Sequence, residues 1–240
     1  MKKSRKDFDL IIFDLDGTLY PVNQEIDAVY PKIAIRFAAQ ATGKSEMEVQ
    51  AEFLEKKNKL AGIINGRPTN TLTLIYFYDV DMMEYENAID RELAVESILS
   101  RDDRLIRTLK SVSSHYPLFL FTGNNEKVTT RILGALGIAD FFPENRRYTF
   151  TDIMRLPIST HEKLDYIKPS LNGFRSVLNL TNVHPGKALM VGDSEVTDIL
   201  PARQIGIQTY HVSTHESLYR LPMWLGIEQP EAQKSEIYVD

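Results

Sequence analysis

Four aspartates stand close behind short apolar runs, and their carboxylates are the side chains of this sequence best suited to chemistry. Asp14 and Asp16 follow one such run, and Asp193 and Asp198 follow another. A carboxylate can act as a nucleophile, carry a proton or bind a hard cation. Two carboxylates about 4 Å apart repel each other by about 4 kcal/mol at an effective dielectric constant of about 20. A pocket that gathers all four therefore needs cations.

A metal ion and a lysine are the cations that could balance these charges. The sequence has no cysteine, which excludes a thiol nucleophile and Cys-ligated zinc. An oxygen-only ligand set favours a hard cation, Mg²⁺ before Zn²⁺. We expect Lys168 to be the fixed cation, because Pro169 is expected to open a helix directly after it. The alternative for any single aspartate is a turn former or a helix N-cap, but four together at strand ends favour a site.

The elements that must position these residues alternate between strands and helices. Strands are predicted at residues 8–13, 117–121, 188–191 and 205–211, with a weaker candidate at 148–153, and helices at 103–114, 126–136, 171–180 and 195–204. Such alternation predicts an α/β fold with a doubly wound parallel sheet and right-handed crossovers. Ligands bind at the carboxyl ends of the strands of such a sheet, so we expect the aspartates, Thr122 and Asn124 to converge at one edge.

One long stretch between the first two strands interrupts this alternation. From about residue 23 to 100 the pattern is nearly all helical, and Ile26, Tyr30 and Ile33 recur at the spacing of one helix face. The stretch is too long for an ordinary crossover. We therefore expect a core domain at residues 1–21 and 101–240, and an inserted helical cap domain at residues 22–100.

Composition and charge exclude several other classes of protein. The 33 acidic residues outnumber the 28 basic ones, and the one dense basic run, at residues 2–6, is expected to be a solvated tail, so we expect no nucleic-acid partner. No apolar run is long enough for a signal peptide or a membrane span, and we expect a cytoplasmic protein with no membrane contact. The polar end from residue 227 to 240 is expected to be loosely held.

Four further features have a chemical and a structural interpretation. His211 and His215 could share a metal if they lay on one helix, but a loop after a strand is expected there. Tyr76, in an aromatic run, could stack on a base, but packing is favoured. Arg67 could reach a substrate anion, although a solvated surface position is favoured. Trp224 is expected to seal the C-terminal segment against the core.

Four motifs in this order resemble those of the haloacid dehalogenase (HAD) superfamily. They are Asp-Leu-Asp-Gly-Thr-Leu from Asp14, Thr-Gly-Asn from Thr122, Lys168-Pro169, and Gly-Asp-Ser-Glu-Val-Thr-Asp from Gly192. The resemblance covers most of the chain and implies a Rossmann-like HAD core. The helical insertion resembles the C1-type cap of that superfamily.

The resemblance implies a role for each motif residue. Asp14 would be the nucleophile that forms an aspartyl-phosphate, Asp16 the general acid and base, and Lys168 the neutralising cation. The residues implied for substrate phosphate binding are Thr18, Thr122, Gly123, Asn124 and Lys168. Those implied for Mg²⁺ are Asp14, the backbone carbonyl of Asp16, and Asp193, with Asp198 in support. The dehalogenases of the superfamily lack the second aspartate, so Asp16 favours phosphoryl transfer over carbon–halogen cleavage.

A finer resemblance concerns the substrate, which is expected to be a small phosphorylated metabolite. Tyr20-Pro21 after the first motif, Lys168-Pro169-Ser170, and residues 70–99 resemble the pyrimidine 5′-nucleotidase-like branch. The sequence therefore predicts a Mg²⁺-dependent phosphatase, with a pyrimidine nucleoside monophosphate as one candidate substrate. The alternatives are a sugar- or glycolate-type phosphatase, a phosphomutase, and a catalytically idle phosphate-binding module. The oligomeric state stays open.

Overall fold

The structure is a computed structural model that describes residues 5–64 and 68–227. Three features named above lie wholly or partly outside these ranges: Arg67, the first part of the basic run, and the polar end beyond residue 227. Among the described residues, no helix is both long and apolar enough to cross a membrane.

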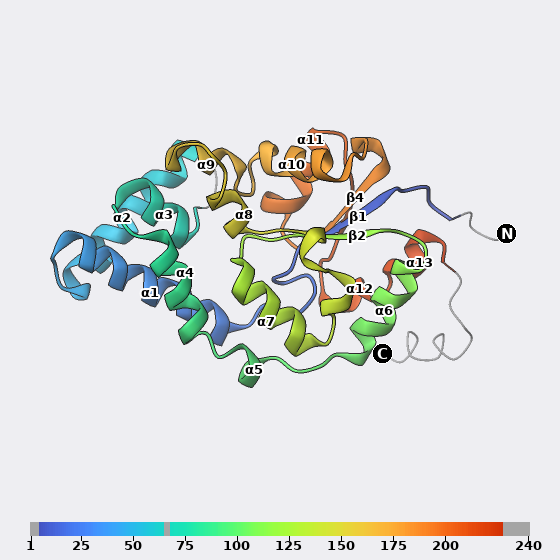
Figure 1. The fold of residues 1–240 in the computed structure, drawn as a ribbon, viewed down its shortest axis with the longest axis horizontal. Helices are drawn as coiled ribbons and strands as arrows, with labels where there is room; N and C mark the ends of the chain where they lie inside the picture. Colours follow the sequence, from blue (N-terminus) through green and yellow to red (C-terminus); the bar gives the residue numbers. More distant parts are fainter. Residues whose placement is uncertain (1–4, 65–67, 228–240) are drawn as a thin grey trace.

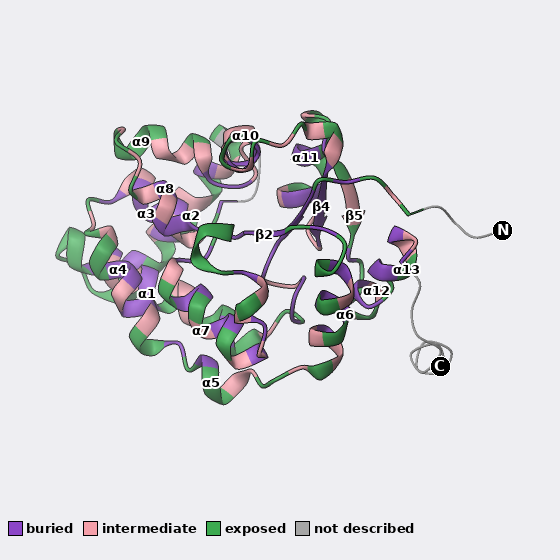
Figure 2. Cartoon of the chain, turned by 45° about the vertical axis from the view of Figure 1, so that its right-hand side comes forward, coloured by how far each residue is buried: buried purple, intermediate pink, exposed green. Residues whose placement is uncertain are grey.

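The centre of the molecule is a five-stranded parallel sheet in the order β3-β2-β1-β4-β5 (Figure 1). Its strands are β1 (Leu10–Phe13), β2 (Leu118–Phe121), β3 (Arg147–Tyr148), β4 (Ala188–Gly192) and β5 (Gln208–His211). Every residue of β1, β2 and β4 is buried, as is usual for a parallel sheet covered on both faces (Figure 2). The predicted α/β fold with a doubly wound parallel sheet is confirmed.

Helices cover both faces of this sheet. On one side lie α6 (Asp103–Ser113), α7 (Glu126–Leu136), α12 (His215–Leu218) and α13 (Leu221–Leu225), and on the other α8 (Phe150–Met154), α10 (Leu171–Thr181) and α11 (Leu200–Gln204), while α9 (Thr160–Lys163) lies next to α8 toward one end of the molecule. Alternate side chains of a strand point to opposite faces. Ile11 and Phe13 accordingly join the apolar cluster of α6 and α7, whereas Leu10 and Ile12 join the cluster of α10 and α11.

Of the helices between β1 and β2, the first four gather at one end of the molecule, and the fifth lies beside α7 (Figure 1). They are α1 (Gln24–Thr42), α2 (Glu46–Ile64), α3 (Asn70–Phe77), α4 (Met82–Glu92) and α5 (Val95–Ile98). The first of them has clear sequence signals at both ends. The Asn23 side chain accepts from the backbone N–H of Glu25 and Ile26, and Gly43 ends the helix with a φ of 67°. We call these five helices the helical insertion.

The structure corrects four local predictions. The strand candidate at residues 148–153 is only the end of β3, because Thr149 and Asp152 form a capping box that starts α8. Pro169 does not open a helix, since α10 starts at Leu171 with Ser170 as its N-cap. The predicted helix at 195–204 begins with a π-helical turn, Glu195–Ile199, before α11. The nearly all-helical stretch from about residue 23 to 100 is interrupted at Leu93 and Ala94, between α4 and α5.

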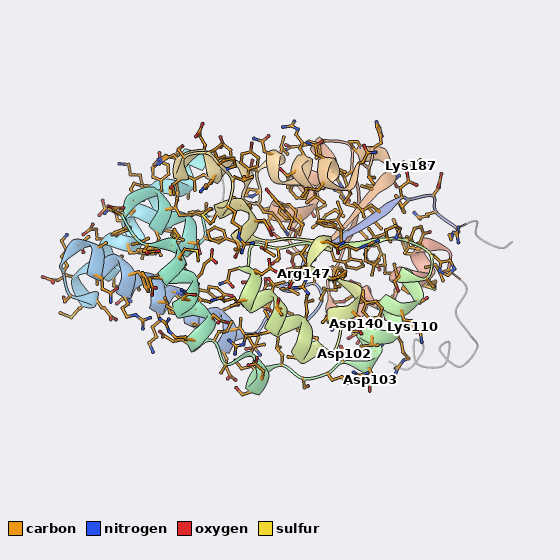
Figure 3. The ribbon with its side chains drawn as sticks, viewed as in Figure 1. Asp102, Asp103, Lys110, Asp140, Arg147 and Lys187 are labelled. Carbon is orange, nitrogen blue, oxygen red and sulfur yellow. The ribbon has the colours of Figure 1, made fainter. Side chains whose placement is uncertain are left out.

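The chain ends of the described part are fixed to each other away from the helical insertion. Trp224 stacks on Phe8 with ring centroids 6.4 Å apart and packs edge-on against Tyr210 at 5.1 Å, which confirms its predicted sealing role. Lys187 pairs with Asp7 just before β4 begins, at the right of Figure 3. Arg147, labelled near the centre of that figure, donates to the carbonyl of Phe142 and thereby fixes β3.

Candidate active site

A tight turn directly after β1 carries the first two aspartates. The backbone N–H of Asp14 still donates to the Val191 carbonyl at 2.9 Å, so the sheet holds this residue in register with β4. Gly17 then reverses the chain with a φ of 78°, and a Cβ atom there would lie 2.4 Å from Asp193 Oδ2. Only glycine fits this close approach. The turn therefore brings the ends of β1 and β4 together.

Lys168 lies between two of the carboxylates. Its Nζ atom is 2.5 Å from Asp14 Oδ1 and 2.8 Å from Asp198 Oδ1. Lys168 and Asp14 are each 8% exposed, and Asp198 is 1% exposed. Burial by itself would lower the pKa of Lys168, but Asp14 and Asp198 outweigh it and hold this pKa above its usual range. The ammonium group therefore stays charged and offsets the buried carboxylates.

Asp16 has a different environment, made of uncharged donors. The Tyr20 hydroxyl donates to its Oδ1, and Asn124 Nδ2 donates to its Oδ2 at 2.7 Å. The Tyr30 hydroxyl of α1 in turn donates to Asn124 Oδ1 at 2.6 Å. Burial raises the pKa of the Asp16 carboxyl, although both hydrogen bonds act in the opposite direction. Asp16 is thus held in one orientation and suited to hold a proton.

Asp14, Asp193 and Asp198 together form a group that could hold a metal ion. One carboxylate oxygen from each lies within 4.8 Å of the others. The Thr18 hydroxyl donates to Asp193 Oδ1 at 3.1 Å, and burial and the charge of Asp198 raise the pKa of Asp193. Three carboxylates beside one lysine leave an excess of negative charge, and their oxygen-only donor set fits Mg²⁺. The residues present therefore fit the metal implied by the sequence.

The loop after β2 brings the second motif to the same edge. Gly123 and Asn124 line the cavity described below, whereas Thr122 and Thr18 are fully buried and do not line it. The Thr122 hydroxyl instead accepts from the backbone N–H of Asn124 at 3.1 Å. Contact of these two threonines with the substrate phosphate stays a prediction. Their hydroxyls bind neighbouring protein groups.

A cavity of about 470 Å³ joins these residues to the helical insertion. From the core it is lined by Asp14, Asp16, Gly123, Asn124, Lys168, Asp193 and Asp198, so seven of the nine predicted site residues lie around one space. The opposite wall comes from the helical insertion, with Asp27, Tyr30, Lys57, Thr69, Asn70 and Thr71. Sequence analysis missed this wall, because none of its residues belongs to a motif or a spacing pattern with chemical meaning.

Two of the other features take no part in this cavity. Tyr76 lines a neighbouring space of about 790 Å³ and packs against Phe77 at 4.8 Å and His161 at 5.0 Å, as the packing interpretation expects. His211 and His215 do not share a helix, since the first ends β5 and the second begins α12. The ring of His211 instead makes a hydrogen bond with the Asp193 backbone carbonyl at 2.8 Å, a contact that no sequence pattern indicated.

Known structures share this architecture. A HAD phosphatase from Thermococcus onnurineus is 22% identical, with a TM-score of 0.56, and the match covers 92% of this chain and all of that one. A 2-haloacid dehalogenase from Pseudomonas syringae pv. Tomato is 21% identical, with a TM-score of 0.53 and coverage of 91% and 98%. A HAD-hydrolase from Bacillus subtilis, bound to magnesium, is 18% identical, with a TM-score of 0.54 and coverage of 90% and 99%. At these identities the likeness shows the fold alone.

A family model gives the more specific result. The model of the haloacid dehalogenase-like hydrolases matches residues 8–206, a span that contains β1 to β4 and every cavity residue named above. The chain, which carries its carboxylate cluster at the carboxyl ends of these strands, therefore belongs to the haloacid dehalogenase-like hydrolases.

Proposed function

We propose that this hydrolase cleaves a small phosphate monoester, with Asp14 as the nucleophile. Asp14 lines the cavity, and Lys168 holds its carboxylate in one position. Attack of an Asp14 oxygen on phosphorus gives an aspartyl-phosphate and releases an alkoxide. Water then attacks the same phosphorus, which breaks the bond between Asp14 and phosphorus, releases inorganic phosphate and restores the Asp14 carboxylate. A carboxylate nucleophile splits one slow displacement into two easier ones.

The observation that carries this proposal is the pair of aspartates with unlike environments in one cavity. Burial raises the pKa of both carboxyls, but Asp14 has a lysine partner, whereas Asp16 accepts hydrogen bonds from the neutral donors Tyr20 and Asn124. An alkoxide leaving group needs a proton, and a carboxyl group with a raised pKa can supply it and later take one from water. A halide needs no proton, so this pair favours a phosphatase over a dehalogenase.

Charge neutralisation would do most of the remaining work. Asp14, Asp193 and the backbone carbonyl of Asp16 would hold Mg²⁺, which supplies positive charge beside the phosphoryl oxygens when bound. Both oxygens of Asp198 already have partners, Lys168 Nζ at 2.8 Å and the Ser194 N–H at 3.2 Å, which supports an indirect role for it. Gly123 and Asn124, which line the cavity after β2, would contact the phosphoryl group.

We further propose that residues 22–100 act as a C1-type cap over a core of residues 1–21 and 101–240. The helical insertion supplies one whole wall of the cavity, so it would decide which leaving group fits. Within the described residues, Tyr30 is the only aromatic side chain on that wall, and its hydroxyl is bound to Asn124. The wall is otherwise polar, which favours a small polar leaving group over the base of a pyrimidine nucleotide.

Phosphate release from p-nitrophenyl phosphate and from a set of metabolite monoesters tests this function directly. We expect release that depends on Mg²⁺, stops in excess EDTA, and is lost in Asp14→Asn, since the amide has nearly the same shape but is a poor nucleophile. Asp7→Asn, an exposed change of the same kind outside the cavity, serves as the control. Full activity of folded Asp14→Asn would contradict the proposal. Transfer of the phosphoryl group to a second substrate position, without free phosphate, would indicate a phosphomutase.

A further inference from the structure

The wall that the helical insertion contributes to the cavity carries one ammonium group. Lys57, on α2, is half-buried there, and its Nζ donates to Asn70 Oδ1, at the start of α3, at 2.7 Å. Among the described residues no carboxylate forms an ion pair with Lys57. The charge of a half-buried ammonium group is not neutralised by an uncharged amide oxygen, so this group can form an ion pair with a ligand.

Lys57 differs in this respect from the other lysine of the cavity. Lys168 forms ion pairs with two carboxylates, Asp14 and Asp198, which neutralise its charge. Burial alone lowers the pKa of Lys57, and no nearby acid raises it. An anion entering the cavity would offset that cost of burial. Of the described lining residues, Lys57 is thus the cation still available to a ligand.

The neighbours of Lys57 on this wall fit a charged or hydroxylated ligand. Thr69, Asn70 and Thr71 bring polar side chains, and the described part of the insertion adds no aliphatic side chain to the cavity. The one acid that the described part of this wall adds, Asp27, is exposed and forms no ion pair with Lys57.

We propose that Lys57, held in place by Asn70, binds a second anionic group of the substrate, opposite the phosphoryl site. The substrate class is then a small phosphate monoester that carries a carboxylate or a second phosphate. This proposal rests on the proposed function for the phosphoryl half of the cavity, and it names the part of the substrate that the catalytic residues do not contact. Asn70 is a positioning residue for the Lys57 ammonium.

Binding of phosphonates that cannot be hydrolysed tests this without turnover. The probes are 3-phosphonopropionate and ethylene-1,2-diphosphonate, each with a second anion, and propylphosphonate, which has none. With Mg²⁺ present, calorimetry should show that the wild-type protein binds one of the two-anion probes roughly tenfold to a hundredfold more tightly than propylphosphonate. The tighter of the two identifies the second anion as a carboxylate or a phosphate.

Variants on α2 show whether Lys57 causes this preference. Lys57→Met should remove it, and Lys57→Arg should restore part of it, while Lys59→Met, at an exposed position of the same helix, should keep it. The restoration by arginine separates a charge effect from a loss of fold. Equal binding of all three probes by the wild type, or a preference that survives in Lys57→Met, would overturn the proposal.

The same samples distinguish failure of this inference from failure of the proposed function. Hydrolysis of p-nitrophenyl phosphate together with equal binding of the three phosphonates overturns the Lys57 inference and leaves the phosphatase in place. A Lys57-dependent preference in a protein that releases no phosphate from any ester supports the anion site and contradicts the phosphatase.

Discussion

At the scale of single residues, the site depends on two aspartates of the same chemistry in different surroundings. Lys168 keeps a full positive charge beside Asp14, which suits an ionised nucleophile. Asp16 is held by the Tyr20 hydroxyl and the Asn124 amide, and burial raises its pKa. Burial raises the pKa of Asp14 as well, so the difference between the two lies in the lysine that contacts the Asp14 carboxylate and favours its ionised form.

Asp16→Asn should lower kcat in proportion to how much the leaving group needs a proton. For an alkyl phosphate we expect a loss on the order of 10²–10⁴-fold, the usual size of general acid–base catalysis. For p-nitrophenyl phosphate the loss should be much smaller, since p-nitrophenolate leaves unprotonated. Asp27→Asn, which removes an exposed acid of the same cavity, should keep the ratio of the two rates near the wild-type value. Equal losses for both esters in Asp16→Asn would contradict the acid role.

How far sequence could predict these residues depends on where their neighbours come from. Asp14, Asp16 and Asp193 end buried strands, so topology alone brings them together. Thr18 follows β1, and its hydroxyl donates to Asp193 Oδ1. No sequence pattern indicates this hydrogen bond. Lys57 could not be predicted either, since it reaches the cavity only through the packing of the helical insertion.

At the scale of elements, the predictions are correct where the residue pattern indicates one type of element only. Continuous apolar runs located β1, β2 and β4. The helix expected at residues 126–136 is α7, which begins after the N-cap Asn125 and ends at the C-cap Gly137. The prediction failed at residues 148–153, where β-prone side chains coincide with the Thr149–Asp152 capping box. The hydrogen bonds of the capping box favour a helix there over a strand, and they cannot be deduced from a pattern of side-chain types.

The contact between α4 and α8 contains a buried acid with a testable effect on stability. Glu86 accepts from the Thr151 hydroxyl at 2.9 Å, and burial raises its pKa despite this bond and the charges of Arg155 and Lys127. An acid whose pKa is raised on folding stabilises the fold while protonated. That contribution is lost as the pH rises through the folded-state pKa, above the usual value of 4.5.

Glu86→Gln should remove this pH dependence and keep a hydrogen-bond acceptor for Thr151. Thermal unfolding from about pH 4 to pH 8 should show the Tm of Glu86→Gln rising relative to the wild type as the pH increases through that window. Glu84→Gln, an exposed change on the same helix, should show no such trend. A Tm difference between Glu86→Gln and the wild type that stays constant with pH would show that burial does not raise the pKa of the Glu86 carboxyl.

At the scale of the whole molecule, the helical insertion is joined to the core on the side of α7. Arg131 of α7 donates to the backbone carbonyls of Asp90 and Leu93 and pairs with Glu96, and Lys127 donates to Asn87. The cavity lies toward α2 and α3, and among the described residues no side-chain hydrogen bond between those helices and the core faces it. We propose a cap that pivots on its α7 side; its opening would break the Tyr30–Asn124 hydrogen bond and the Tyr76–His161 contact.

In the proposed mechanism the phosphoryl group passes through a covalent bond to Asp14. Acid quench during turnover, followed by peptide mass mapping, measures this directly. We expect a phosphoryl group on the peptide that carries Asp14. Borohydride should reduce the phosphorylated Asp14 to homoserine, and neither product should form in Asp14→Asn. Turnover in which no phosphoryl group can be trapped on this peptide, together with phosphate release by folded Asp14→Asn, would contradict it.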